Sequence, residues 1–457
     1  MIRILRGWEN YWFRPAPLLD LGVCRIIIVG CQLVFLQLMF PPYFNRDLDS
    51  LPNDLYDPIP VLHLFVWLFG WNARPSAELN EIIRWVTSGF GVLALVGFLT
   101  RPSLICFALG NAFLFAFKYS FGDLRHAEAL PIIALAILAL SPAGKALSVD
   151  DLRRRTALAM KARVFTPFRL DEEHSVFARW PLLLLQWMMA LVYLSAAVSK
   201  LESGFEWMNG HTLQYYLLQE GVRWERGVGL WLSQYHSLAV LLSWITVAFE
   251  STFFLVLIVP RLAWFYLPLG VLLHLGMDLA LKANFVPWLS IYAAFVPWTA
   301  LIRRLSQRQS LLGSQSAAKP EILFDDECPL CIRSITVVRY ADWFDRLTFS
   351  GLGTRWPEVA RRYPEVSRAD CQREIHVILP DGTIARGFFA FRKLLKYLPP
   401  LWPLITVFYL PLASRFGPRI YRYVASRRGR FHVCEDATCA VPAVPQESSQ
   451  SAPTSAS

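Results

Sequence analysis

The stretch EILFDDECPLCIRS, residues 321–334, decides how the C-terminal third of this chain folds. Its first four residues, EILF, form a short stretch with three successive apolar residues, as in a buried strand. The sequence PLCIRSITVVRYADWF, which follows the first cysteine, predicts a helix. Pro329 suits the first position of that helix, because the N–H that proline lacks needs no partner there. A strand therefore runs directly into a Cys-x-x-Cys pair at the start of a helix.

This junction predicts redox chemistry at Cys328 and Cys331. The free N–H groups and partial positive charge of a helix N-terminus stabilise a thiolate, so we expect the pKa of Cys328 to fall below the ~8.5 of free cysteine. Cys331 lies one turn further on, where it could resolve a mixed disulfide. Asp325, Asp326 and Glu327 add negative charge that opposes thiolate formation, although a carboxylate could also shuttle the proton.

A zinc site is the alternative for the two cysteines. A closed structural zinc site needs four ligands, and the sequence CEDATC at 434–439 could supply the other two. We favour redox use without a metal, because a lone Cys-x-x-Cys with no second pair makes a poor zinc site.

Strand and helix patterns alternate on both sides of this loop. The sequence REIHVILPDGTIARGFF predicts two strands around an Asp-Gly turn at 381–382, and 388–397 predicts a further helix. The apolar run 400–412 is broken by prolines and is too short to span a membrane. The pattern indicates a small α/β domain over 321–440. The Pro-, Ser- and Ala-rich tail, 441–457, is expected to be disordered.

The first 305 residues have a different character. Of the 457 residues in the chain, 55% are hydrophobic and only 18% are charged, which is too apolar for an ordinary soluble protein. A spanning helix needs about 20 mostly apolar residues. Runs near that length occur at 18–40, 79–100, 102–119, 126–141, 180–199, 237–259, 262–281 and 285–302. The sequence predicts a polytopic α-helical membrane domain of about eight spans over 1–305, and a polar linker over 306–320.

A shorter apolar run, VLHLFVWLFGW at 61–71, is expected to be re-entrant or interfacial. The Lys and Arg residues between the runs predict the orientation. With a cytoplasmic N-terminus, the inside loops hold sixteen of them and the outside loops eight. The net charge of +10 comes from such loops and not from a basic, aromatic face, so we expect the lipid bilayer as a partner and no nucleic acid. We expect an integral protein of a bacterial inner (plasma) membrane with both termini cytoplasmic.

Four ionisable residues fall within the apolar runs: Arg25, Glu250, His274 and Asp278. Charge inside a bilayer is costly, so such residues are paired or functional. We predict that Arg25 and Glu250 form an ion pair that locks two helices together. Lys200 ends another run, where it is either a lysine that snorkels to water or a base that loses its charge on burial.

Two parts of the chain resemble known families. The motif Asp325-x-x-Cys328-x-x-Cys331, with REIHVILPDGTIARGFFAFRKLLKYLPPLWPL and RIYRYVASRRGRF, resembles the DCC family of thiol-disulfide oxidoreductases. This resemblance covers 321–431 and implies a thioredoxin-like fold in which Cys328 attacks and Cys331 resolves. The sequences LVYLSAAVSKLESGFEWMNG, DLRHAEALPIIALAILALSP and HLGMDLALKANFVPWLSIYAAFVP resemble the vitamin K-dependent γ-carboxylase-like HTTM family.

The HTTM resemblance implies roles for three residues. Lys200 matches the base that deprotonates the quinol in the carboxylase, and His126 matches a histidine that assists at carboxylation. His274 matches a histidine in a later helix, which we assign to cofactor binding. The implied cofactor of the membrane domain is a quinone, whereas the thiol domain requires no cofactor.

Three functional hypotheses follow. The leading one is a membrane-bound thiol-disulfide oxidoreductase whose Cys328–Cys331 pair exchanges electrons with a partner thiol protein or peptide. The second is a γ-carboxylase-like membrane enzyme that acts on a quinol or peptide substrate with Lys200 as base. The third is a non-enzymatic membrane scaffold or maturation factor that holds client peptides.

Overall fold

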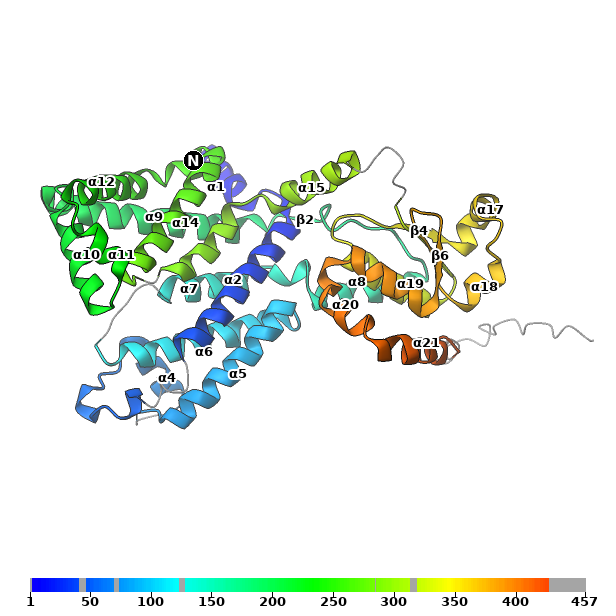
Figure 1. Cartoon of the computed structure of the whole chain (residues 1–457), viewed down its shortest axis with the longest axis horizontal. Coiled ribbons are helices and arrows are strands. Elements are labelled where there is room, and N and C mark those ends of the chain that lie inside the picture. The colour runs from blue at the N-terminus through cyan, green and yellow to red at the C-terminus, as the bar shows by residue number, and fades with distance from the viewer. Residues whose placement is uncertain are drawn as a thin grey trace, which may run out of the picture. The chain divides into compact units, whose positions relative to one another are not determined.

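The computed structural model describes residues 2–40, 47–69, 74–122, 128–283, 285–312 and 319–426. The chain divides into two compact units (Figure 1). We call Met1–Arg154 with Arg169–Arg308 the membrane unit, and Arg155–Phe168 with Gln309–Ser457 the thiol unit.

The membrane unit is built from helices. Among the residues that the structure describes, six helices are long and apolar enough to cross a bilayer: α2 (Leu18–Met39), α5 (Ala77–Val96), α6 (Thr100–Tyr119), α9 (Arg179–Glu202), α12 (His236–Thr252) continued by α13 (Leu255–Ile258), and α14 (Ala263–Leu281). They confirm six of the eight predicted runs. The other two runs form shorter apolar elements, α7 (Ala129–Leu140) and the 3-10 helix η6 (Val286–Phe295).

The remaining elements of this unit are shorter or more polar. Among them are α1 (Ile2–Phe13), α4 (Pro60–Phe69), α10 (His211–Arg223), α11 (Gly227–Leu232) and most of α15 (Trp298–Leu312), whereas α8 (Val149–Ala162) begins in this unit and ends in the thiol unit. Two short strands, β1 (Ala16–Pro17) and β2 (His174–Ser175), pair antiparallel. The short apolar run at 61–71 contains α4, which packs against α6. Helix α15 continues to Leu312, into the segment that the sequence predicts as a linker.

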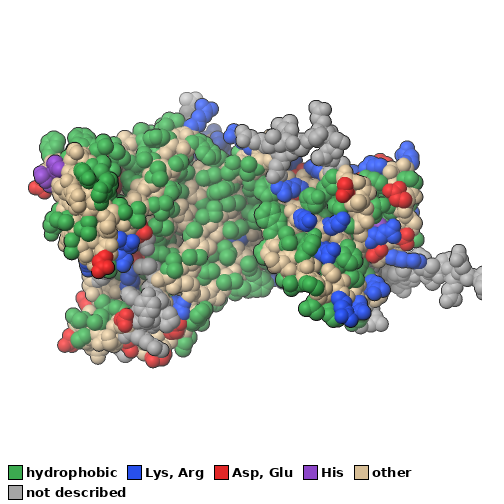
Figure 2. Space-filling model, viewed as in Figure 1, with side chains coloured by type: hydrophobic (Ala, Val, Ile, Leu, Met, Phe, Trp, Pro, Cys, Tyr) green, Lys and Arg blue, Asp and Glu red, His purple; other side chains and the backbone are tan. Residues whose placement is uncertain are grey.

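Large apolar side chains cover the outward faces of the long helices. Leu38, Trp85, Leu191, Trp244 and Leu272 are each more than half exposed. Figure 2 shows apolar side chains spread over much of this unit, with few charges among them. Soluble proteins rarely expose so much apolar surface, and lipid tails would cover it. The membrane unit is therefore integral to a membrane.

One end of the membrane unit gathers chain segments that are far apart in sequence. The backbone N–H and the hydroxyl of Thr299 donate to Asp20 Oδ1 at 2.6 and 2.7 Å. The guanidinium of Arg179 donates to the carbonyl oxygen of Tyr11 at 2.7 Å. The starts of α2, α9 and α15 therefore lie at the same end of the unit.

The predicted ion pair between Arg25 and Glu250 is wrong. The buried guanidinium of Arg25 instead donates to the carbonyl oxygens of Ala143 and Leu147, at 3.1 and 2.5 Å. Ala143 begins the 3-10 helix η3 (Ala143–Lys145), which follows α7, and Leu147 lies two residues after that helix. This contact places the end of α7 beside the start of α2.

The thiol unit contains a four-stranded mixed sheet in the order β4-β3-β5-β6. The strands are β3 (Glu321–Phe324), β4 (Thr348–Gly351), β5 (His376–Ile378) and β6 (Ile384–Arg386). Strand β3 is parallel to β4 and antiparallel to β5, with Ile322 opposite both Phe349 and Val377. The helices are α16 (Pro329–Ala341), α17 (Leu352–Arg362), α18 (Arg368–Arg373), α19 (Gly387–Leu394), α20 (Pro403–Phe408) and α21 (Pro411–Ser426).

Successive residues of β3 face two different cores. Ile322 and Phe324 pack in a core with residues of α16 and α19. Leu323 packs in a second core with residues of α17 and α18. Side chains alternate across a strand, so a central strand covered on both faces must be apolar throughout. This explains the three successive apolar residues that follow Glu321 in this strand.

A segment between α8 and α9 completes the first core. Phe165 is buried there, with its ring centroid 5.4 Å from that of Phe324 and 5.5 Å from that of Phe349. The guanidinium of Arg339 in α16 donates to the carbonyl oxygen of Phe168 at 2.7 Å. The thiol unit is thus assembled from two separate stretches of chain.

The structure confirms the predicted strand 321–324, the helix after it, the hairpin strands β5 and β6, and the helix that begins at Gly387. The sequence did not predict β4, α17, α18 or α21. Strand β4 has the sequence TFSG, in which a single large apolar residue gives no recognisable pattern.

Candidate functional site

The Cys-x-x-Cys loop has the local geometry that the sequence predicts. Cys328 is the N-cap of α16, with an extended backbone, and Pro329 is the first helical residue. The N–H of Ile332 donates to the carbonyl oxygen of Cys328 at 2.9 Å, which closes the first turn. Cys331 lies in that turn. Both cysteines therefore belong to the N-terminal turn of the helix, where backbone amides lack partners within the helix, and the side chain of Cys328 makes no capping hydrogen bond to them.

The two cysteines differ in exposure. Cys328 is buried, at 8% exposure. Cys331 is half-buried, and its side chain lines a cavity in the thiol unit. The cavity is thus lined by Cys331, the expected resolving cysteine, and not by Cys328, the expected attacking cysteine.

The three acidic residues before Cys328 have different surroundings. Asp325 lines the cavity, and its Oδ1 accepts the N–H of Glu327 at 3.0 Å. The Oδ1 of Asp326 accepts the N–H of Gly353 at 2.5 Å, at the start of α17. Asp325 and Asp326 therefore hold the loop through backbone hydrogen bonds, in addition to any role in proton transfer.

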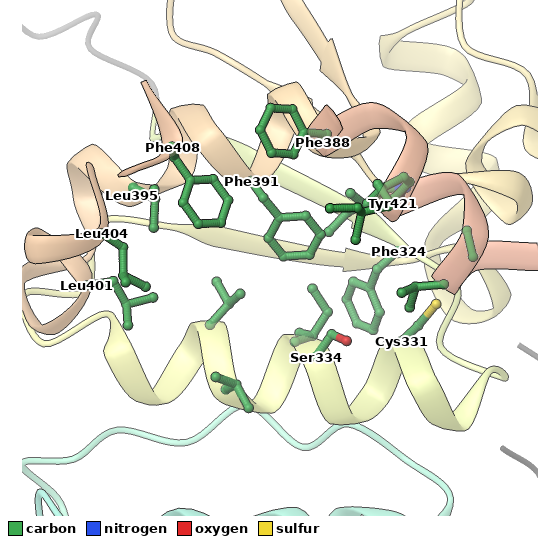
Figure 3. A pocket seen from close by; sticks show the side chains of 18 of the residues that line it. Phe324, Cys331, Ser334, Phe388, Phe391, Leu395, Leu401, Leu404, Phe408 and Tyr421 are labelled. Carbon is green, nitrogen blue, oxygen red and sulfur yellow. Dashed lines mark hydrogen bonds between the residues drawn. The ribbon is translucent and has the colours of Figure 1, made fainter. Parts of the chain in front are cut away.

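The cavity beside Cys331 has a volume of about 660 Å³, within the usual range for ligand pockets. Its wall comes from α16, α19, α20 and α21 and is almost entirely apolar. Figure 3 shows Cys331 and Tyr421 at one end, with Leu401, Leu404 and Phe408 at the other. The surroundings of Cys331 therefore suit an apolar molecule or an apolar peptide segment.

A third cysteine, Cys371, also lines this cavity. Burial, with a smaller contribution from the neighbouring Asp370 carboxylate, raises the pKa of Cys371 to about 11. Cys371 therefore remains a neutral thiol at neutral pH, and a neutral thiol is a poor nucleophile.

In the membrane unit, Lys200 of α9 is paired with Glu250 of α12. The ammonium group lies 2.7 Å from Glu250 Oε2 and 2.9 Å from Oε1, and both side chains are largely buried. The ammonium also lies 5.2 Å from the ring centroid of Trp207. Lys200 is therefore held by an ion pair and does not extend into water as a snorkelling lysine would.

His274 of α14 belongs to a buried chain of hydrogen bonds. The hydroxyl of Tyr193 lies 2.6 Å from His274 Nε2 and 2.6 Å from the hydroxyl of Tyr292 in η6. Tyr193 also packs edge-on against Phe249, the residue before Glu250. The Lys200–Glu250 pair and this chain thus neighbour each other within one helical bundle.

Three of these residues were not predicted as site residues from the sequence: Tyr193, Tyr292, and Glu250 as the partner of Lys200. A tyrosine inside an otherwise apolar run was the available signal, because its hydroxyl needs a partner when it is buried. A second buried ion pair, Lys118–Glu128 at 2.8 Å, also went unpredicted.

Part of the predicted site cannot be placed. His126, Cys434 and Cys439 lie outside the described residues. Within the parts of the chain that the structure describes, no three His, Cys, Asp or Glu side chains come together in a group that could hold a metal ion.

Comparison with known families accounts for both units. The model of the HTTM domain matches residues 13–299, and that of the DCC1-like thiol-disulfide oxidoreductase matches residues 322–433. The chain therefore belongs to the HTTM domain family and carries a DCC1-like thiol-disulfide oxidoreductase domain after its membrane unit. No curated protein and no solved structure matches the chain.

Proposed function

We propose that this protein is a membrane-bound thiol-disulfide oxidoreductase that uses Cys328 and Cys331 for exchange with a partner thiol protein or peptide. The observation that carries the proposal is the position of the pair at the junction of a buried strand and a helix, with Cys331 in the wall of a cavity. A thioredoxin-like fold for the thiol unit is part of the proposal. It is supported by the helix α16, which starts at the cysteine pair and connects the parallel strands β3 and β4.

The reaction needs no cofactor. The thiolate of Cys328, stabilised at the N-terminus of α16, attacks a disulfide of the partner. One partner sulfur leaves as a thiolate, and a mixed disulfide forms. Cys331 then attacks Cys328, which releases the second partner sulfur and leaves a Cys328–Cys331 disulfide. Two electrons pass to the partner, and the reverse sequence oxidises it.

The proposal is tested by the reduction of insulin disulfides with the full-length protein in detergent. Cys328→Ser should lower the rate to background, because the attacking sulfur is lost. Cys331→Ser should leave the mixed disulfide unresolved, so that mass spectrometry detects a partner peptide bound to Cys328.

Cys371→Ser is the matched control, because Cys371 lines the same cavity but should not react, and its rate should equal that of the unaltered protein. Insulin reduction by Cys328→Ser at the unaltered rate, without a trapped species, would refute the proposal. A stable client found with no redox turnover would favour the scaffold hypothesis instead.

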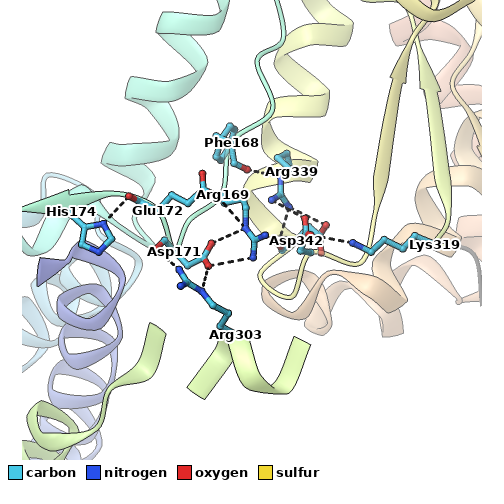
Figure 4. A network of polar contacts seen from close by, with 10 residues as sticks. Phe168, Arg169, Asp171, Glu172, His174, Arg303, Lys319, Arg339 and Asp342 are labelled. Carbon is cyan, nitrogen blue, oxygen red and sulfur yellow. Dashed lines mark hydrogen bonds and ion pairs between the residues drawn. The ribbon is translucent and has the colours of Figure 1, made fainter. Parts of the chain in front are cut away.

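We further propose that the membrane unit crosses the bilayer eight times. Residues 155–168 and 319–426 both belong to the thiol unit, so they must lie on one side of the membrane. Figure 4 shows Arg339 of α16 bonded to Phe168 and Asp342. The chain between these two stretches contains three long apolar helices, α9, α12 and α14. An even number of crossings is required, so η6 must supply the fourth.

The surroundings of η6 support this crossing. It packs against α2, α7, α9 and α14. Ten residues of 3-10 helix rise about 20 Å, less than the ~30 Å of the hydrocarbon layer, so flanking residues must complete the path. Irregular backbone is tolerated at this depth when protein surrounds it. The excess of Lys and Arg in the same loops favours the cytoplasm for this face.

Lys200 does not carry a second proposal. A base must offer an unshared electron pair, whereas the ammonium of Lys200 donates to both carboxylate oxygens of Glu250. The geometry therefore supports the thiol chemistry better than the γ-carboxylase-like alternative.

A further inference from the structure

Most of the exposed large apolar side chains in the described part of the thiol unit lie on α20 and α21 or directly beside them. We call this set the apolar face: Trp402, Leu404, Val407, Tyr409, Leu410, Leu412, Phe416, Ile420, Tyr423 and Val424. Exposed apolar side chains that are scattered singly are ordinary, but such a concentration marks a contact surface.

Helix α21 is fixed in one orientation by the side that it buries. A Cβ added at Gly417 would lie 2.3 Å from the ring of Phe388, so α21 and α19 are in close contact at this point. The N–H of Ile375 donates to the hydroxyl of Tyr421 at 3.0 Å. Gly417 and Tyr421 are four residues apart and therefore share one side of the helix. The thiol unit holds α21 by this side and leaves the rest of the helix exposed.

Two rows of exposed side chains run along the rest of α21, one apolar and one basic. The apolar row is Leu412, Phe416, Ile420 and Tyr423, and the basic row is Arg415, Arg419 and Arg422. Within each row the residues are three or four positions apart, so they lie on one side of the helix. A basic row beside an apolar row is typical of a helix that lies in the plane of a membrane interface.

The charge of the surrounding sequence has a single sign. From residue 382 to residue 426 the chain contains seven Lys or Arg residues and no Asp or Glu. This stretch therefore supplies no acidic partner for its own basic side chains. Anionic lipid headgroups attract clusters of Lys and Arg, so the basic row is complementary in charge to a membrane surface that contains them.

The chain connections keep the apolar face close to a membrane. The thiol unit is joined to the integral membrane unit at three points, after Arg154, Phe168 and Arg308. These links are covalent, so the thiol unit cannot diffuse away from the bilayer. A tethered surface meets its target at a high effective concentration, and a modest affinity for lipid is then sufficient.

We propose that α20 and α21 lie in the interface of the membrane that holds the protein. The apolar face enters the boundary between headgroups and acyl chains, and Arg415, Arg419 and Arg422 bind anionic headgroups. The inference concerns the membrane contact of the thiol unit and does not depend on its redox chemistry.

The cavity beside Cys331 reaches the surface on this same side. Five residues belong both to the cavity wall and to the apolar face: Leu404, Val407, Phe416, Ile420 and Val424. With the apolar face in the interface, the cavity meets lipid instead of water. An apolar molecule dissolved in the bilayer then enters the cavity without crossing water.

The test uses the full-length protein in nanodiscs of phosphatidylcholine and phosphatidylglycerol. Tyr423 is replaced by the photo-crosslinking residue p-benzoylphenylalanine, and the irradiated protein is digested and analysed by mass spectrometry. Tyr423 belongs to the apolar face but not to the cavity wall, so a link there reports on the surface. The peptide of residue 423 should carry the mass of a phospholipid.

The same replacement at Glu358 is the control for the position of the crosslinker. Glu358 is exposed and lies in α17, which packs on the other face of the sheet from α16, α19 and Tyr421. The lipid-linked fraction should therefore be much smaller at residue 358 than at residue 423.

Reversal of the basic row tests the role of charge. Arg415→Glu, Arg419→Glu and Arg422→Glu together should lower the lipid-linked fraction at residue 423 by about twofold or more, because anionic headgroups then repel the helix. The fraction should fall in the same direction for the unreversed protein in nanodiscs of phosphatidylcholine alone. Slow alkylation of Cys371 shows that the reversed protein remains folded, and the change of lipid decides the point if it does not.

An equal change of charge elsewhere in the thiol unit is the matched control. Arg355 and Arg361 of α17 and Arg373 of α18 are exposed. Arg355→Glu, Arg361→Glu and Arg373→Glu together should leave the lipid-linked fraction at residue 423 unchanged.

Four results would overturn the inference. Residue 423 could link to a peptide of the membrane unit, which would show that the apolar face packs within the chain. It could link to a second copy, which a mixture of nitrogen-15-labelled and unlabelled protein detects. It could link to lipid no more than residue 358 does. Finally, a folded protein with the reversed basic row could link to lipid as well as the unreversed protein, which would remove the anionic headgroups from the contact.

Discussion

At the scale of single residues, the cavity of the thiol unit holds two cysteines with different chemistry. Cys331 lies in the first turn of α16, where backbone N–H groups are available. Cys371 is buried in the second core and has a pKa raised to about 11, mainly by burial and further by Asp370. In the proposed reaction, position in the fold rather than residue type separates the thiol that reacts from the thiol that does not.

This difference predicts how fast Cys371 is alkylated. At pH 8, a thiol of pKa about 11 has roughly two hundred times less thiolate than one of pKa ~8.5. Because thiolate is the reactive form, the iodoacetamide rate of Cys371 should be lower by at least that factor than for a cysteine peptide in the same tube. The rate should also rise about tenfold for each pH unit between 7 and 9.5. Timed labelling and mass spectrometry measure both; a rate that levels off near pH 9 would show an ordinary thiol.

Lys200 shows the same dependence on position. The sequence shows only a lysine at the end of an apolar run. Such a lysine either extends its ammonium to water or has a functional role. The structure places Glu250, fifty residues further along the chain, within 2.7 Å of its ammonium. Removal of one partner of such a pair leaves a buried charge without compensation, so either residue alone is a poor target for substitution.

At the scale of elements, the redox loop is supported by the contact between Asp326 and the turn after β4. A Cβ added at Gly351 would lie 2.2 Å from Asp326 Oδ2 and 2.9 Å from Asp326 Cβ. The same carboxylate accepts a hydrogen bond from the backbone N–H of Gly353. The turn between β4 and α17 therefore needs glycine at 351, because the loop carries an aspartate at 326.

Gly351→Ala should therefore destabilise the thiol unit by about 1–3 kcal/mol, the usual cost of an overpacked site. The full-length protein in detergent is heated with a thiol-reactive dye, and labelling of the buried Cys371 reports unfolding of this unit. The double variant Gly351→Ala with Asp326→Gly should recover most of the loss, since the clash disappears. Additive effects of the two changes would show that these residues do not interact in this way.

At the scale of the whole molecule, the thiol unit is built from two stretches of chain that are separated by several membrane helices. Phe165 from the segment between α8 and α9 is part of the same core as Phe324 of β3. A core cannot form across a bilayer. This loop and the C-terminal part of the chain must therefore be on the same side, whichever side that is.

Three single substitutions test this arrangement: Lys161→Cys in the inserted stretch, Glu358→Cys in α17, and Glu225→Cys between α10 and α11. All three native side chains are exposed. A membrane-impermeant maleimide should label the first two sites from one face, in intact cells or in inverted vesicles, and the third from the other face. Peptide mapping identifies each labelled site. Labelling of Lys161→Cys and Glu358→Cys from opposite faces would contradict both the shared core and the eight crossings.

The sequence by itself determined the membrane helices and the redox loop. Long apolar runs specify spanning helices because a bilayer leaves no other partner for the backbone. The strand–Cys-x-x-Cys–helix junction is equally local, since β3, Cys328 and α16 follow one another in the chain. The two short runs that became α7 and η6 were recognised by the same signal, although their lengths were overestimated.

Only the tertiary structure decided which distant groups meet. The partners of Arg25, Lys200 and His274 lie 50 to 122 residues away in the chain, so their identity depends on how the helices pack. The cavity beside Cys331 and the entry of Phe165 into the thiol core depend on packing in the same way. The physical reason is that the hydrophobic effect is non-directional. It favours burial of every apolar segment, but only close packing of complementary shapes determines which segments become neighbours.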